Sequence, residues 1–309
     1  QVLELTEARQ TFRFGGLAAR PVASILRGFS APVVLDRAVP AAERAFLLAH
    51  DTDPFNRWEA GRALAKDVLA RMVTKGAAPS VDLLEGMARL AFDDSLDPAF
   101  RALALRLPSE DDMAATLHAA GQVPDPARIH AARRALGLAL AEKLAPGLPD
   151  LEWACRTEGP FSPAAGPAGQ RALRLAALAL MARLDGGAAA QLAFAQASNM
   201  TESFGALAIL LENGHGKQEL AAFGSRWTHD RLVMDKWFSL QILCAAPDRA
   251  AAVTQKLTEH PLFDWKNPNR FRSVIGALSA NHAGFHHASG DGYTLVADWL
   301  LKLDPKNPQ

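Results

Sequence analysis

The spacing of hydrophobic residues along the chain changes near residue 38. In the first 37 residues the apolar side chains fall in three short stretches, at positions 2–5, 12–14 and 22–35, and the pair Gly15-Gly16 follows the second stretch. Short apolar stretches bounded by turn residues are typical of β-strands. This region is therefore predicted to form three strands.

Three strands are too few for a complete β-sandwich. A sheet that began at residue 1, with no partner strand before it, would leave unpaired backbone groups along its edge. We therefore expect residues 1–37 to be the last strands of a β-sandwich domain that is truncated in this chain.

From about Pro40 onward the apolar positions follow a helical period. Leu64, Val68 and Met72 recur every four residues, and the stretch from Val233 to Cys244 has the spacing i, i+4, i+7, i+11. An apolar face of this kind must be buried against other helices. Residues 38–309 are therefore predicted to form a helical domain.

Helix starts and ends are marked along this region. A capping residue followed by proline is typical of a helix start, because proline fills a position whose N–H has no partner. Such pairs occur at Asp53-Pro54, Asp97-Pro98, Asp125-Pro126, Ser162-Pro163 and Asn267-Pro268. Glycines that follow periodic segments predict helix ends. They are Gly76, Gly121, Gly147, Gly186, Gly214 and Gly224.

These signals predict about a dozen helices joined by short loops, arranged as helical hairpins. No strict repeat length recurs. The predicted fold class is mainly α, an irregular α-helical solenoid preceded by a few strands of a truncated β-sandwich.

Charge, hydropathy and cysteine content indicate which partners and which compartment to expect. Lys plus Arg and Asp plus Glu are equal at 33 each, which argues against nucleic acid as a partner. No apolar run reaches the roughly 20 residues of a membrane span, and no export signal opens the chain. Cys155 and Cys244 lie far apart in helical patterns, as expected for reduced core residues. A cytoplasmic protein that contacts no membrane is predicted.

The motifs of known catalytic sites are missing from the sequence. His282 and His286 are four residues apart, but Ala283 follows the first where zinc peptidases have glutamate, and Gly284 and the residues after His287 predict a loop. We expect no metal site there. The remaining histidines stand singly, and Cys155, although it precedes the basic Arg156, has no histidine near it in sequence. No catalytic, metal or cofactor-binding residue is predicted in this chain.

One segment has an unusual charge pattern. Arg270 and Arg272 follow the predicted helix start Asn267-Pro268 directly, where the helix dipole favours anions and disfavours cations. Two interpretations remain open at this point. The arginines form a site for a carboxylate or phosphate, or they pair with acidic residues of a neighbouring helix.

Several segments resemble, in order, the C-terminal half of bacterial aminopeptidase N, a family of zinc-dependent alanyl aminopeptidases of the gluzincin type. The resemblance covers nearly the whole chain. The segments are Arg20-Pro21-Val22 through Val33, Asp53 through Trp58, Asn199-Met200-Thr201, Leu232 through Phe238, and Asn267 through Ser273.

The resemblance implies that residues 38–309 are a helical cap domain, truncated at its end, that lines the peptide cavity of the parent enzyme. Zinc and the catalytic residues would belong to the parent's catalytic domain, because nothing here matches that family's zinc ligands. The implied partners are that catalytic domain and peptide substrates, and the fragment alone should be inactive. Arg272 is the implied cavity residue, with Gln309 as a second candidate. The alternative is a free-standing helical scaffold that binds a protein partner.

Overall fold

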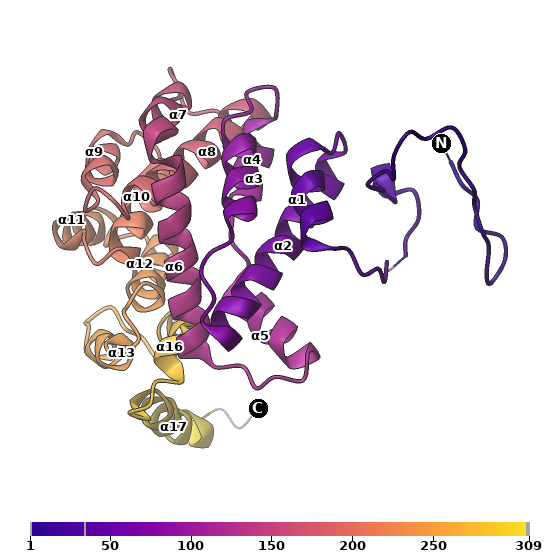
Figure 1. Cartoon of the computed structure of the whole chain (residues 1–309). Helices are drawn as coiled ribbons and strands as arrows, with labels where there is room; N and C mark the ends of the chain where they lie inside the picture. The colour runs from indigo at the N-terminus through magenta and orange to yellow at the C-terminus, as the bar shows by residue number, and fades with distance from the viewer. Residues whose placement is uncertain (1, 34, 307–309) are drawn as a thin grey trace.

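Residues 41–306 form a continuous series of helices joined by short loops (Figure 1). The computed structural model describes residues 2–33 and 35–306. The helices are α1 (Ala41–His50), α2 (Pro54–Lys75), α3 (Val81–Ala91), α4 (Pro98–Ala104), α5 (Glu110–Ala119), α6 (Pro126–Leu144), α7 (Leu148–Ala154), α8 (Ala165–Met181), α9 (Ala188–Gln196), α10 (Met200–Glu212), α11 (Lys217–Trp227), α12 (Arg231–Leu243), α13 (Ala250–Thr258), α14 (Pro268–Phe271), α15 (Ala277–Ala280), α16 (His282–Phe285) and α17 (Asp291–Leu303). Short helical turns are η1 (Arg27–Phe29), η2 (Ala145–Gly147), the π-helical turn η3 (Arg272–Gly276) and η4 (Asp304–Lys306).

Neighbouring helices pack mainly as antiparallel pairs and small groups. Helix α1 contacts α2 and α3, and α9 contacts α10. The long helix α6 runs through the middle of the array, where it touches helices as distant in sequence as α2 and α16 (Figure 1). Among the described residues, no helix is both long and apolar enough to span a bilayer.

The core is a row of clusters instead of one central mass. The first lies between α1 and α8 and includes Leu64, Leu83 and Leu140. Smaller clusters follow between α8 and α10 and between α10 and α12. The last, around Phe238 and Val274, joins α12, α13, η3, α15 and α17. Each cluster is shared only by elements near one another in the series, which confirms the predicted irregular α-helical solenoid.

Four of the five predicted cap–proline pairs begin helices. The side chains of Asp53, Asp97, Asp125 and Asn267 each accept a hydrogen bond from a first-turn backbone N–H, and proline occupies the first position of the helix. The fifth pair, Ser162-Pro163, was wrong as a helix start. Ser162 instead accepts a bond from Ala164 N at 3.2 Å in the loop before α8.

Three of the six glycines predicted to end helices do not do so. Gly186 is left-handed, with φ 67°, but it lies five residues after α8 ends at Met181. Gly224 lies inside α11, and Gly147 has φ −104° rather than a left-handed conformation. A β-carbon at Gly147 would lie 2.6 Å from the Phe92 ring, and one at Gly224 would lie 2.8 Å from the indole of Trp237. Glycine is needed at these two positions because an aromatic ring packs closely against the backbone, and not because the chain reverses direction there.

The three predicted strands are absent from residues 2–33 and 35–40. Apart from η1, the described backbone of residues 2–39 makes one backbone–backbone hydrogen bond, from Val33 N to Ala31 O. A strand requires the backbone of a partner strand, which local propensity does not supply. Without one, the apolar side chains stay exposed, as at Val2 (87%) and Leu5 (72%).

The N-terminal segment is attached to the first two helices by a set of polar contacts. Arg27 binds Asp51 at 2.7 Å and Thr52 at 2.6 Å, and the side chain of Asn56 donates to Ser24 and to the carbonyl of Ile25. Arg20 and Arg37 also pair with Glu43 of α1, at 3.0 and 3.5 Å, while most of the remaining indigo segment extends away from the helices (Figure 1).

Candidate functional site

The segment that carries the two arginines is helical but irregular. Asn267 Oδ1 accepts hydrogen bonds from the backbone N–H of Asn269 at 3.0 Å and Arg270 at 3.2 Å, which begins α14. The π-helical turn η3 follows directly at Arg272. A π-turn places an extra residue in the turn and changes the direction of the side chains around it. Arg270 and Arg272 accordingly have different surroundings.

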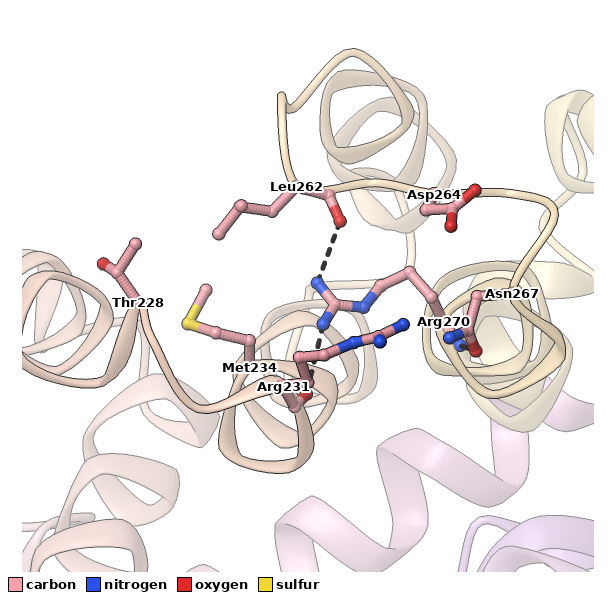
Figure 2. Close-up of a pocket in the computed structure, with 7 residues that line it drawn as sticks. All are labelled: Thr228, Arg231, Met234, Leu262, Asp264, Asn267 and Arg270. Carbon is pink, nitrogen blue, oxygen red and sulfur yellow. Dashed lines mark hydrogen bonds between the residues drawn. The ribbon is translucent and has the colours of Figure 1, made fainter.

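Arg270 is buried and fully engaged. Its Nε donates to Asp235 Oδ1 at 2.5 Å, and its two terminal nitrogens donate to the carbonyls of Leu262 at 3.0 Å and Arg231 at 3.1 Å (Figure 2). The guanidinium also lies 4.8 Å from the ring centre of Phe238. Of the two interpretations of the arginine pair, pairing with an acidic residue of a neighbouring helix therefore holds for Arg270, which joins α14 to α12.

Arg272 is exposed, and its side chain makes no hydrogen bond or ion pair with any other residue that the structure describes. It lines a groove of about 620 Å³. The other lining residues are Trp265, Lys266, Pro268, Phe271, Leu303 and Lys306. No described residue therefore occupies the N–H donors of the Arg272 guanidinium, which lies in an open groove.

The groove combines an aromatic surface with positive charge. The ammonium groups of Lys306, Lys302 and Lys266 lie 4.6, 5.3 and 5.9 Å from the ring centre of Trp265, and Lys302 is also 4.2 Å from that of Trp299. None of the described residues that line the groove is acidic. Cations near an aromatic face and a free guanidinium favour binding of a carboxylate with an apolar group beside it.

The lysines near the indole of Trp265 were not identified from the sequence. Lys302 and Lys306 come from the end of α17 and from η4, more than thirty residues after Trp265. A pair of lysines four residues apart at a helix end is common, and only the fold brings it to the indole. The second predicted cavity residue, Gln309, lies outside the described residues.

The histidines near residue 285 point to different partners. His282 Nε2 lies 2.8 Å from Asp111 Oδ1 of α5, and His286 Nδ1 lies 2.6 Å from the hydroxyl of Tyr293. Within the described chain, no three His, Cys, Asp or Glu side chains are grouped so that they could hold a metal ion. The predicted loop was wrong in part, because Gly284 belongs to α16, where its missing side chain leaves room for Ala250.

Both cysteines are free thiols in apolar surroundings. Burial raises the pKa of the Cys155 thiol, and burial raises that of Cys244 to about 12. Burial of Cys155 outweighs the lowering effect of Arg101 and Arg174 on its pKa, and the guanidinium of its neighbour in sequence, Arg156, is hydrogen-bonded to Glu152 at 2.9 Å. The thiols are therefore held protonated, as expected for core residues and not for nucleophiles.

Comparison with known proteins shows similarity over the full chain. Aminopeptidase N of Caulobacter vibrioides is 40% identical over 317 residues, and aminopeptidase N of Haemophilus influenzae is 32% identical over 318 residues. Each alignment covers 100% of this chain and 36% of the relative. The chain thus spans about a third of the length of these relatives, and it aligns with their C-terminal region.

A solved structure of Legionella pneumophila aminopeptidase A in complex with aspartic acid shares the fold. It is 29% identical with a TM-score of 0.81, and the match covers 96% of this chain and 36% of that one.

Two family models match consecutive parts of the sequence. Residues 1–38 match a domain of unknown function, DUF3458, described as having an Ig-like fold. Residues 41–309 match DUF3458_C, a domain of unknown function described as ARM repeats. Since the second match spans most of the sequence, the chain belongs to the DUF3458_C family.

Proposed function

We propose that this chain is the helical cap of a zinc-dependent aminopeptidase of the aminopeptidase N type, which removes N-terminal amino acids from peptides. The observation that carries the proposal is the similarity of the entire chain to aminopeptidase N at up to 40% identity. Because the chain spans only 36% of those relatives, the activity belongs to a longer parent protein. In this proposal residues 1–37 belong to the preceding sandwich domain and 38–309 to the cap.

Zinc and the catalytic groups would be supplied by the catalytic domain of the same parent chain. The described histidines of this chain do not fit a zinc site, since His282 and His286 are bonded to different partners. The role of this chain would be to pack against the catalytic domain, enclose the cavity and contact the peptide. A cytoplasmic location remains a prediction from the two cysteines, which lie far apart in sequence and suit reduced core residues.

Within the cap, Arg272 is the proposed contact for the C-terminal part of a peptide substrate. Its planar guanidinium offers donors to a carboxylate or carbonyl, and the indole of Trp265 provides an apolar surface in the same groove. Gln309 remains the second candidate, proposed from the resemblance alone.

Replacing Arg272 by Ala in the full-length parent tests this role. A charged hydrogen bond contributes about 1.5 to 3 kcal/mol, so kcat/KM for tripeptides should fall about ten- to hundredfold, with a smaller loss if water fills the groove. A small aminoacyl amide, which ends before this region, should be hydrolysed normally. Arg89→Ala on α3 is the control, since Arg89 is also exposed and makes no described contact. Equal losses for both substrates, or none, would refute the assignment.

The alternative, a free-standing helical scaffold that binds a protein partner, would be favoured by a natural reading frame that ends near Gln309. On our proposal the 309 residues alone release no amino acid from an aminoacyl amide and hold no stoichiometric zinc. Metal analysis that found one tightly bound zinc per chain would contradict the proposal.

A further inference from the structure

A second pocket, of about 220 Å³, shares no lining residue with the Arg272 groove (Figure 2). It is formed where α12 and α14 begin and where the loop before α14 passes over them. Its lining residues are Thr228, Arg231, Met234, Leu262, Asp264, Asn267 and Arg270. The proposed peptide contact uses none of these side chains, and Arg270 among them is structural.

The backbone around this pocket is fixed by the buried Arg270. Its guanidinium donates to Arg231 O at the start of α12 and to Leu262 O in the loop, while it is itself part of α14. The three segments are therefore held together by one side chain that is only 6% exposed. A site with its walls held in this way loses little entropy when a ligand binds.

The pocket contains opposite charges that are not paired. The contact between Arg231 and Arg270 is made by the backbone carbonyl of Arg231. The guanidinium of Arg231 makes no hydrogen bond or ion pair with any of residues 2–33 and 35–306. The carboxylate of Asp264 accepts one hydrogen bond, from the backbone N–H of Lys266 at 3.1 Å, and has no cationic partner in the same part of the chain. A guanidinium and a carboxylate thus line one small pocket without forming an ion pair with each other.

The other side of the pocket is apolar. Met234 is 2% exposed and Leu262 is 37% exposed, and in Figure 2 their side chains lie away from Asp264 and Asn267. The volume of about 220 Å³ is several times the ~30 Å³ of one water molecule and below the ~300 Å³ at which pockets for drug-sized ligands begin. The pocket therefore suits a small molecule with both charges and a short apolar part.

We propose that this pocket binds one free α-amino acid with an aliphatic side chain. The ligand carboxylate binds the guanidinium of Arg231, the ammonium binds the carboxylate of Asp264, and the side chain contacts Met234 and Leu262. At neutral pH an α-carboxyl group is ionised and an α-amino group is largely protonated, so the ligand carries both charges. A simple anion is disfavoured here by Asp264, in contrast to the groove at Arg272. The aminopeptidase activity proposed above would release molecules of this class, but the site is inferred independently of that activity.

Titration calorimetry of the 309-residue chain with leucine tests the proposal. N-acetylleucine lacks the ammonium and leucinamide lacks the carboxylate, so each should bind at least about tenfold more weakly than leucine, since each loses one charged contact. Aspartate should also bind more weakly, because its side chain places a second carboxylate against Met234 and Leu262. Absence of leucine binding, or equal binding of N-acetylleucine, would overturn the proposal.

Two variants locate the binding in this pocket. Arg231→Gln and Asp264→Asn should each raise the Kd for leucine at least about tenfold, because each removes one of the two charges. Arg89→Gln and Asp248→Asn are matched controls at exposed positions without described contacts, and they should leave the Kd unchanged. Thermal unfolding of each variant shows that it is folded. If the two pocket variants bind leucine as the controls do, the site is elsewhere and the assignment is wrong. No readout here involves peptidase activity, so failure leaves the Arg272 prediction untouched.

Discussion

Gly224 shows how a single residue can be fixed by its neighbour in space. It lies in the interior of α11, where a glycine normally destabilises a helix. Its missing side chain makes room for the indole of Trp237, whose Nε1 donates to Leu220 O at 3.0 Å. The glycine thus allows α11 and α12 to approach closely while the indole N–H stays paired.

Gly224→Ala should therefore destabilise the protein although alanine is the better helix former. The added carbon would lie 2.8 Å from Nε1 and 3.0 Å from Cε2 of Trp237, and the indole cannot move without breaking its hydrogen bond. We expect a loss of about 1 to 3 kcal/mol in the free energy of unfolding. Gly166→Ala in α8 meets nothing within 4 Å and should be neutral or stabilising by up to about 1 kcal/mol. Equal effects in urea unfolding would contradict the packing argument.

The two arginines of α14 and η3 show what sequence could not resolve at the residue scale. The sequence shows their charge and their position at a helix start. It does not decide between an anion site and pairing with an acidic residue. In the structure the two arginines have different environments. Arg270 bonds to Asp235, thirty-five residues earlier, whereas Arg272 at the start of the π-turn is exposed. Neither the π-turn nor the partner has a local sequence pattern.

At the scale of elements, helix starts depend on single side chains whose effect can be measured. Asp125 Oδ1 accepts a hydrogen bond from Arg128 N at 3.1 Å and begins α6, the long central helix. Asp125→Ala should cost about 0.5 to 2 kcal/mol of unfolding free energy. Ser80 occupies the same position before α3 but makes no capping bond, so Ser80→Ala should change stability by less than about 0.5 kcal/mol. Similar losses for both in denaturant melts would mean that the capping bonds contribute nothing measurable.

The difference between predicted helices and predicted strands has a physical cause. A cap such as Asp97 and the helix it begins are adjacent in sequence, so the local pattern is sufficient. The stretches at 2–5 and 12–14 have strand-forming residues, but a strand is stabilised by hydrogen bonds to residues that propensity does not identify. The prediction that Gly147 ends a helix was wrong for the same reason. Glycine is needed there because the ring of Phe92, more than fifty residues earlier in sequence, packs against it.

At the scale of the whole molecule, neighbouring core clusters are joined by a buried ionic group. Arg174 of α8 donates to Glu152 of α7 at 2.7 Å and to Glu202 of α10 at 2.7 Å. Glu152 also accepts from Arg156, and Glu202 from Asn199. The three charged residues Glu152, Arg174 and Glu202 are each less than 10% exposed. They therefore connect the cluster around α8 to the next part of the array through contacts that depend on ionised carboxylates.

This ionic group should make stability fall in acid. Burial alone would raise the pKa of the Glu152 carboxyl, but hydrogen bonds from Arg156 and Arg174 outweigh it and hold the pKa below its ordinary value of 4.5. A group whose pKa is lower in the folded state contributes stability above its unfolded pKa and loses it as pH falls through the folded pKa. The contribution of Glu152 is thus complete near neutral pH and declines below 4.5.

Glu152→Gln should therefore cost most at neutral pH and progressively less in acid. Near pH 7 the loss should approach the ~3 kcal/mol lower end for a broken buried ion pair, because Glu202 still neutralises Arg174. As the wild-type carboxyl is protonated, the gap between the two proteins should narrow. Glu85→Gln, which removes an exposed pair with Lys143 at 3.5 Å, should cost at most about 1 kcal/mol at any pH. Urea unfolding between about pH 7 and pH 3 measures both differences. A gap that stays constant for Glu152→Gln over this range would show that the side chain acts through packing and not through its charge.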